Sequence, residues 1–172
     1  MKEDKIARDF HQAALVDRSG RGYVCFNFEE DFVENNVRCI PMAVRFKLDE
    51  CGIKLKLCEW NKMIIEERKK LCEFVCVTKE DLYKYRHYLK EVIFNRTGNV
   101  ATELPVEENP AWTHRNELPL LLVEKLAEFN WYVSLPQWQS LTNLQRFVLM
   151  KLSKPGHENK NFPKAVKEFG LV

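Results

Sequence analysis

The stretch IPMAVRFKLDECGIKLKLCEWNKMIIEERKKL, residues 40–71, decides the fold because the chain repeats its pattern 78 residues later. The second copy, residues 118–149, reads LPLLLVEKLAEFNWYVSLPQWQSLTNLQRFVL. Eight of the 32 aligned positions are identical, where composition alone predicts about two. The identical pairs are Pro41/Pro119, Lys47/Lys125, Leu48/Leu126, Glu50/Glu128, Leu57/Leu135, Trp60/Trp138, Arg68/Arg146 and Leu71/Leu149. We therefore expect two tandem copies of one helical unit.

Each copy opens with the signals of a helix. Pro41 and Pro119 suit the first helical position, where a missing N–H removes no hydrogen bond. Gly52 and Asn130 suit the left-handed residue that ends a helix. Each copy therefore begins with a predicted helix of about three turns.

A β-prone segment follows each of these helices. Residues 53–57 alternate apolar and polar side chains, and residues 131–135 are rich in β-formers. One strand alone leaves its main-chain groups unpaired. We therefore expect the two segments to pair with each other as a short two-stranded ribbon across a pseudo-twofold axis.

Capping boxes predict the remaining helices. Ser134 with Gln137 and Thr142 with Gln145 predict helices at about 135–140 and 143–152, and the first copy aligns these with 57–63 and 65–73. Outside the copies, residues 78–81 predict the start of an amphipathic helix that ends near Gly98. A last short helix is expected to begin at Lys160 or Asn161 and to end near Gly170.

Composition predicts a folded protein. The 172 residues are 45% hydrophobic and carry a formal charge of only +2, which does not favour disorder or a generally basic nucleic-acid surface. We expect an all-α, mainly helical fold, with one domain over 23–172 that holds both copies. Residues 1–22 are expected to form a flexible extension, and 99–117 an extended connector.

The six cysteines are expected to be reduced thiols that pack as small apolar residues. Neither a signal peptide nor a transmembrane stretch is visible. Only Cys72 and Cys76 are close, and no second pair completes a metal site. We expect no metal, no cofactor and no membrane contact.

Four residues of the repeat are interpreted as structural. Trp60 and Trp138 are expected to be buried between helices, because an indole covers a large apolar area. Arg68 and Arg146 are expected to form an ion pair or to donate hydrogen bonds to carbonyls at helix ends.

Two polar clusters are candidates for binding. The acidic run Glu29, Glu30 and Asp31 suits a hard cation or acid–base chemistry, and it also suits a solvated turn or pairing with the nearby Arg38. The second cluster lies between two expected helices, where it suits either helix capping or the binding of an anion or a partner. It consists of His157, Glu158, Asn159, Lys160 and Asn161.

Motifs of known enzyme classes are absent. The chain contains no phosphate-binding glycine loop, no Gly-x-Ser-x-Gly elbow and no dinucleotide fingerprint. Residues 143–152 carry some residues of a DNA-reading helix, but their apolar neighbours predict burial. We therefore do not expect an enzyme or a nucleic-acid-binding protein.

Several blocks of the sequence resemble one family. They are residues 26–34 (FNFEEDFVE), 38–42 (RCIPM), 47–57 (KLDECGIKLKL), 103–106 (ELPV), 144–147 (LQRF) and 157–162 (HENKNF). Together they resemble the nitrate reductase-associated proteins, from about residue 26 to the end. The resemblance implies a small cytoplasmic protein linked to nitrate assimilation, and it brings no catalytic residues.

The function that we expect is that of a non-catalytic accessory protein, with nitrate reductase or a related component as its protein partner. The alternative is a sensor of a small molecule or anion that uses Arg38, His157 and Lys160.

Overall fold

A computed structural model describes residues 25–29, 37–156 and 160–172, and the prediction of a mainly helical protein is confirmed. The chain divides into two compact units, Met1–Glu107 and Glu108–Val172, and each is described by itself. The extension expected at 1–22 lies outside the described residues. One domain over 23–172 stays a prediction.

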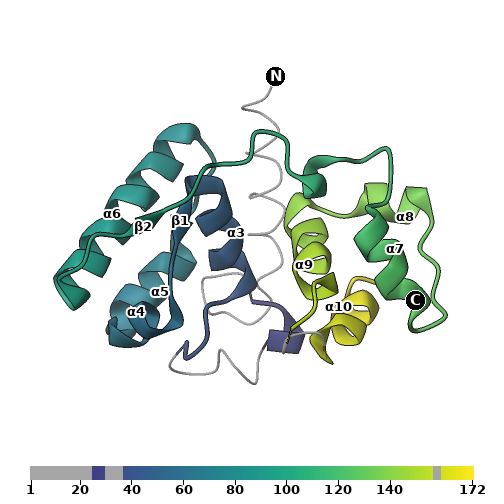
Figure 1. Ribbon diagram of the computed structural model, residues 1–172, viewed down its shortest axis with the longest axis horizontal. Helices are drawn as coiled ribbons and strands as arrows, with labels where there is room; N and C mark the ends of the chain where they lie inside the picture. Colours follow the sequence, from purple (N-terminus) through teal and green to yellow (C-terminus); the bar gives the residue numbers. More distant parts are fainter. Residues whose placement is uncertain (1–24, 30–36, 157–159) are drawn as a thin grey trace. The chain divides into compact units, whose positions relative to one another are not determined.

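The first unit is built around its longest helix, α6, which packs against α3, α4 and α5 (Figure 1). Its core includes Val44 and Leu48 from α3 and Leu89 and Ile93 from α6. The elements in chain order are η1 (Asn27–Glu29), α3 (Met42–Cys51), β1 (Ile53–Lys54), α4 (Leu57–Lys62), α5 (Ile65–Glu73), α6 (Lys79–Thr97) and β2 (Thr102–Glu103).

A left-handed glycine joins α3 to β1. Gly52 has φ 66° and ends α3, which is the backbone conformation that glycine adopts without strain. A Cβ at this position would lie 2.5 Å from the carbonyl oxygen of Leu104. The close approach of the two segments therefore requires glycine for a second reason.

The predicted pairing of the β-prone segments is wrong. Only Ile53–Lys54 forms a strand, and it pairs antiparallel with Thr102–Glu103, with Ile53 opposite Glu103. Residues 131–134 form no strand. The partner of β1 comes instead from the connector, expected to be extended over 99–117, which also contains the short helix η2 (Ala111–Thr113).

The second unit is built around α9, which packs against η2, α7 and α10. Its core includes Leu122, Leu126, Phe147 and Phe162, all buried. The rings of Trp112 and Phe147 pack edge to face, with 5.1 Å between the ring centres. The α-helices of this unit are α7 (Leu120–Ala127), α8 (Leu135–Ser140), α9 (Asn143–Ser153) and α10 (Phe162–Glu168).

Helices at aligned positions begin 78 residues apart in the two units: α3 and α7, α4 and α8, and α5 and α9. Asn130, with φ 55°, follows α7 as Gly52 follows α3. Pro41 and Pro119 stand at the N-caps of α3 and α7, one position before the first turn in which they were expected. The duplication and its pseudo-twofold axis stay predictions.

Across residues 25–29, 37–156 and 160–172, no helix combines the length and the apolar character that crossing a membrane requires.

Candidate functional site

The acidic cluster is represented in the structure by Glu29, which is buried. Its carboxylate accepts hydrogen bonds from the backbone N–H of Met42 at 2.7 Å and from that of Phe26 at 3.4 Å. The first of these bonds satisfies an N–H in the first turn of α3, which has no partner inside the helix. Glu29 thus stabilises the start of α3, while Glu30 and Asp31 lie outside the described residues.

The other candidate binding residues are divided between the two units. Arg38 is exposed in the first unit and forms no ion pair with any residue that the structure describes. Lys160 is exposed in the second unit, and Asn161 is buried there, with no hydrogen-bond partner for its Oδ1 among the residues that the structure describes. His157, Glu158 and Asn159 lie outside the described residues. A binding site made of these residues stays a prediction.

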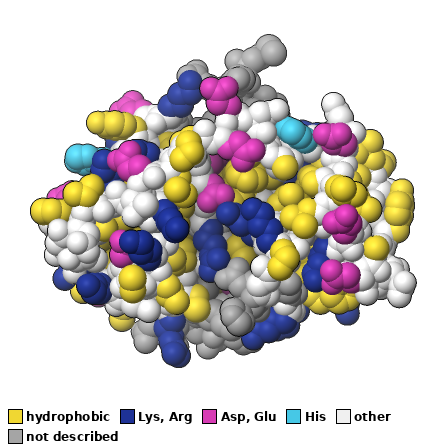
Figure 2. All heavy atoms as spheres, viewed as in Figure 1, with side chains coloured by type: hydrophobic (Ala, Val, Ile, Leu, Met, Phe, Trp, Pro, Cys, Tyr) yellow, Lys and Arg dark blue, Asp and Glu magenta, His cyan; other side chains and the backbone are white. Residues whose placement is uncertain are grey.

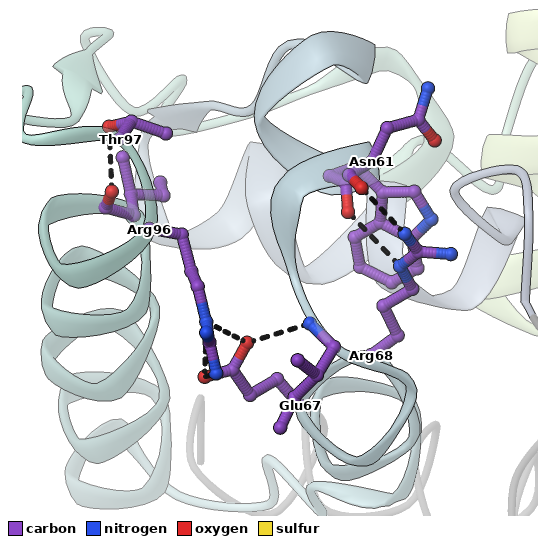
Figure 3. Close-up of polar contacts among 8 residues, drawn as sticks. Asn61, Glu67, Arg68, Arg96 and Thr97 are labelled. Atoms are coloured by element: carbon purple, nitrogen blue, oxygen red, sulfur yellow. Dashed lines mark hydrogen bonds and ion pairs between the residues drawn. The ribbon is translucent and has the colours of Figure 1, made fainter.

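Trp60 and Arg68 form a compact polar cluster in the first unit. The buried indole N–H of Trp60 donates to the carbonyl of Val37 at 2.8 Å. Arg68 donates from Nε to the carbonyl of Trp60 at 3.0 Å and from Nη2 to that of Asn61 at 2.9 Å (Figure 3). Its guanidinium lies 5.9 Å from the Trp60 ring centre. Arg68 therefore bonds the last carbonyls of α4 from the next helix.

Trp138 and Arg146 form the corresponding cluster in the second unit. The indole N–H of Trp138 donates to the carbonyl of His114 at 2.8 Å. Arg146 donates to the carbonyls of Trp112 at 2.7 Å and Leu141 at 2.5 Å, and to the side chain of Asn143. These bonds tie the end of α8 and the turn of η2 to α9.

A buried lysine that we did not single out as a site residue lies at the centre of the first unit. Lys47 Nζ donates to the carbonyls of Leu71, Cys72 and Phe74 at 3.1, 2.9 and 2.7 Å. These carbonyls lie at the C-terminal end of α5, where a cation is favoured. Burial lowers the pKa of Lys47. The identity of Lys47 and Lys125 in the two copies was the signal that could have revealed it.

The thiols of Cys72 and Cys76 lie near this lysine, and Cys51 is also buried. Burial raises the pKa of Cys51 to about 11 and those of Cys72 and Cys76 to about 12. Such thiols remain protonated at neutral pH and are poor nucleophiles. In the described part of the chain, no group of three or more His, Cys, Asp or Glu side chains is arranged to bind a metal ion.

The outward side of α6 carries two exposed aromatic side chains. Tyr83 is 69% exposed and Phe94 is 55% exposed, and the exposed His87 lies between them on the same side of the helix. The two aromatic residues are about 16 Å apart along the helix axis. Figure 2 shows hydrophobic side chains beside basic ones over α6. We name Tyr83, His87 and Phe94 the α6 surface.

Ion pairs fix α6 to its neighbours. Arg96 reaches from α6 to the carboxylate of Glu67 on α5, with an Nε–Oε2 distance of 2.9 Å (Figure 3). Arg86 and Lys90 bind the two oxygens of Glu103 on β2 at 2.6 and 2.7 Å. The hydrogen bond from Lys90 and the charge of Arg86 lower the pKa of Glu103. The α6 surface therefore lies on a helix that ion pairs attach to α5 and to β2.

Comparison with known proteins adds the family. No curated protein and no solved structure was found to match this chain. A family model described as "conserved nitrate reductase-associated protein" matches residues 25–169, close to the span of the resemblance in the sequence. The chain belongs to this family of conserved nitrate reductase-associated proteins.

Proposed function

We propose that this protein is a non-catalytic accessory protein that binds nitrate reductase through the α6 surface. The observation that carries the proposal is the family's description as nitrate reductase-associated. The name describes an association and not a reaction, so a direct contact between the two proteins is its simplest physical basis.

The hydrogen bonds of the buried charged side chains support a role without catalysis. Glu29, Lys47 and Arg146 are buried, and their hydrogen-bond partners are mainly backbone groups at helix ends or turns. Bonds of this kind satisfy groups that a helix leaves unpaired. A catalytic acid, base or nucleophile must instead face a substrate.

The α6 surface supports the binding role. Aromatic side chains concentrate binding energy at protein interfaces, because each buries a large area and has few torsions to order. The interior of the first unit does not use Tyr83 or Phe94, since its core is built from the opposite side of α6, including Tyr85, Leu89 and Ile93. The helix is also fixed by its ion pairs, which reduces the entropy lost on binding.

All six cysteines are free thiols. Free thiols are typical of a reducing compartment, so we place the proposed complex in the cytoplasm.

The test is a binding measurement with purified proteins. Nitrate reductase encoded in the same genome is immobilised, and binding of the full chain is followed by interferometry. We expect saturable binding that the double variant Tyr83→Glu/Phe94→Glu weakens by about tenfold or more. Tyr132→Glu, a change of an exposed aromatic residue in the second unit, is the matched control and leaves the affinity unchanged.

Two outcomes contradict the proposal at different points. If the folded wild-type protein does not bind nitrate reductase, the accessory role is overturned. If the wild type and the Tyr83→Glu/Phe94→Glu variant bind equally, the association stands and the α6 surface is the wrong site. Circular dichroism of each variant confirms that it is folded before binding is compared.

A further inference from the structure

We propose that the exposed side of α7 in the second unit is a docking surface for a basic amphipathic helix of a protein partner. This surface differs from the α6 surface, and the proposal does not depend on binding to nitrate reductase. It consists of Leu120, Val123, Glu124, Ala127 and Glu128, all exposed, and is called the α7 surface.

The apolar part of the α7 surface is a stripe along one side of the helix. Leu120 is 71% exposed and Val123 is 44% exposed, and Ala127 lies one turn further along. The opposite side of α7 already packs in the unit, since Leu122 and Leu126 are buried. The helix is therefore apolar on both sides, which is typical of a helix that has a partner on each side.

The aligned helix of the first unit shows the same positions covered. Met42 of α3, which aligns with Leu120, is buried, and so is Phe46, which aligns with Glu124. In α7 a large apolar residue is retained at the first of these positions, and a carboxylate replaces the aromatic ring at the second. The α7 surface thus combines contact area with charge.

Acidic side chains border the stripe on one side. Glu124 and Glu128 lie one turn apart next to Leu120, and Figure 2 shows acidic side chains beside hydrophobic ones over α7. Glu128 accepts a bond from the largely buried Lys125 at 2.6 Å. Glu124 forms no ion pair within the described ranges of the chain, so its charge is available to a partner.

This charge selects the class of partner. Carboxylates repel the phosphates of nucleic acids and of anionic lipid surfaces. Two α7 surfaces packed on each other about a twofold axis would bring like charges together. An amphipathic helix with an apolar stripe and a border of Lys or Arg complements both parts of the surface. A contact based on one short helix predicts a transient complex of about micromolar affinity.

The test uses two synthetic peptides of about four helical turns. In the first, leucines recur at helical spacing and all other positions are lysine; in the second, each lysine is replaced by glutamate. Binding of the labelled peptides to the full chain is followed by fluorescence anisotropy. We expect the lysine peptide to bind, the glutamate peptide not to bind, and the affinity to fall as salt rises from about 0.05 to 0.3 M.

Variants locate the binding surface. Leu120→Glu/Val123→Glu is expected to weaken binding of the lysine peptide by about tenfold, and Glu124→Lys by about threefold. Val100→Glu, a matched change at an exposed valine of the first unit, leaves the affinity unchanged.

The proposal is overturned if both peptides bind the wild-type protein equally, or if the Leu120→Glu/Val123→Glu variant binds as well as the wild type. The peptide comparison needs no variant, so a variant that fails to fold does not remove the test. If sedimentation shows self-association that Leu120→Glu abolishes, and the lysine peptide does not bind, the occupant is a second copy of this chain and the proposal is wrong.

Discussion

The Trp–Arg clusters of the two units share their residue types and spacing, but they differ in how deeply the arginine is buried. Arg146 is 1% exposed, whereas Arg68 is partly exposed. Both arginines bond the carbonyl of the tryptophan eight residues earlier, at 3.4 and 3.0 Å. In the second unit, the carbonyl of Trp112 in η2 accepts a bond from Arg146.

This difference shows that the local helix geometry and the burial of the arginine depend on different parts of the chain. The spacing of Trp and Arg and the capping boxes determine the helix–turn–helix geometry in both units. In the second unit, Arg146 is almost fully buried, and Trp112, which precedes α7, accepts one of its hydrogen bonds. The same pair of residues therefore has a larger energetic role in the second unit.

The largest effect is expected for Arg146→Met. The change leaves the carbonyls of Trp112 and Leu141 without this donor, and it lowers the free energy of unfolding by about 3 kcal/mol. Arg68→Met is expected to cost about 1 kcal/mol, because water can replace a bond to a partly exposed side chain. Urea unfolding followed by circular dichroism measures both values.

Equal losses in the two variants would show that η2 does not add to the stability of the Trp138–Arg146 cluster. Double variants with Trp112→Ala provide the control. If η2 is responsible, the effects of Trp112→Ala and Arg146→Met are not additive, whereas those of Trp112→Ala and Arg68→Met are.

The second comparison concerns the aligned lysines, Lys47 and Lys125. Lys47 donates to three backbone carbonyls, while Lys125 donates to the side chain of Glu128. We expect Lys47→Met to lower the free energy of unfolding by about 2 kcal/mol, since the end of α5 loses its donor. Lys125→Met is expected to cost about 0.5 kcal/mol, as for a pair with an exposed carboxylate.

The measurement is again urea unfolding. A loss for Lys125→Met as large as that for Lys47→Met would contradict the comparison. Lys47→Arg is a useful further variant, because it retains the charge but places a larger, planar group among the carbonyls. We expect it to be less stable than the wild type.

The third comparison concerns the indoles. Trp60→Phe and Trp138→Phe each remove a hydrogen bond of 2.8 Å to a backbone carbonyl and leave a small cavity in a fully buried site. We expect each change to lower the free energy of unfolding by about 1.5 kcal/mol. A difference of more than about 1 kcal/mol between the variants would show that the two indole sites are not equivalent.

Much of the fold follows from local sequence signals. The capping boxes predict helices at 135–140 and 143–152, and the aligned first copy predicts helices at 57–63 and 65–73, close to the observed α8, α9, α4 and α5. The left-handed positions Gly52 and Asn130 predict where the helix before each of them ends. These features act within a few residues, so a single sequence contains them.

Features that depend on long-range contacts could not be predicted in the same way. The pairing of Ile53 with Glu103 joins segments that are far apart in the chain, and nothing in residues 53–57 specifies that partner. The burial of Glu29 likewise depends on its bond to Met42. The α6 and α7 surfaces could not be predicted from the sequence, because the exposure of Tyr83 or Leu120 depends on what packs against each helix.

The last comparison concerns alkaline pH, at which the two units are expected to differ because all six cysteines lie in the first unit. Burial raises the pKa of Cys51, Cys72 and Cys76 above the value of 9.0 for a free thiol. Above pH 9 the unfolded chain releases protons that the folded protein keeps, so the unfolding free energy falls as pH rises toward 12. The lowered pKa of Lys47 raises the unfolding free energy with pH. The three thiols together outweigh this single amine.

One thiol is expected to contribute about 1.4 kcal/mol to this fall between pH 8 and pH 10. Cys72→Ala is less stable than the wild type at pH 8, because it leaves a cavity, and this deficit is expected to shrink by that amount at pH 10. Met150→Ala, at the aligned position of the second unit, keeps the same deficit at both pH values, because methionine does not titrate. If the Cys72→Ala deficit is also the same at both pH values under reducing conditions, the Cys72 thiol ionises as readily in the folded protein as in the unfolded chain.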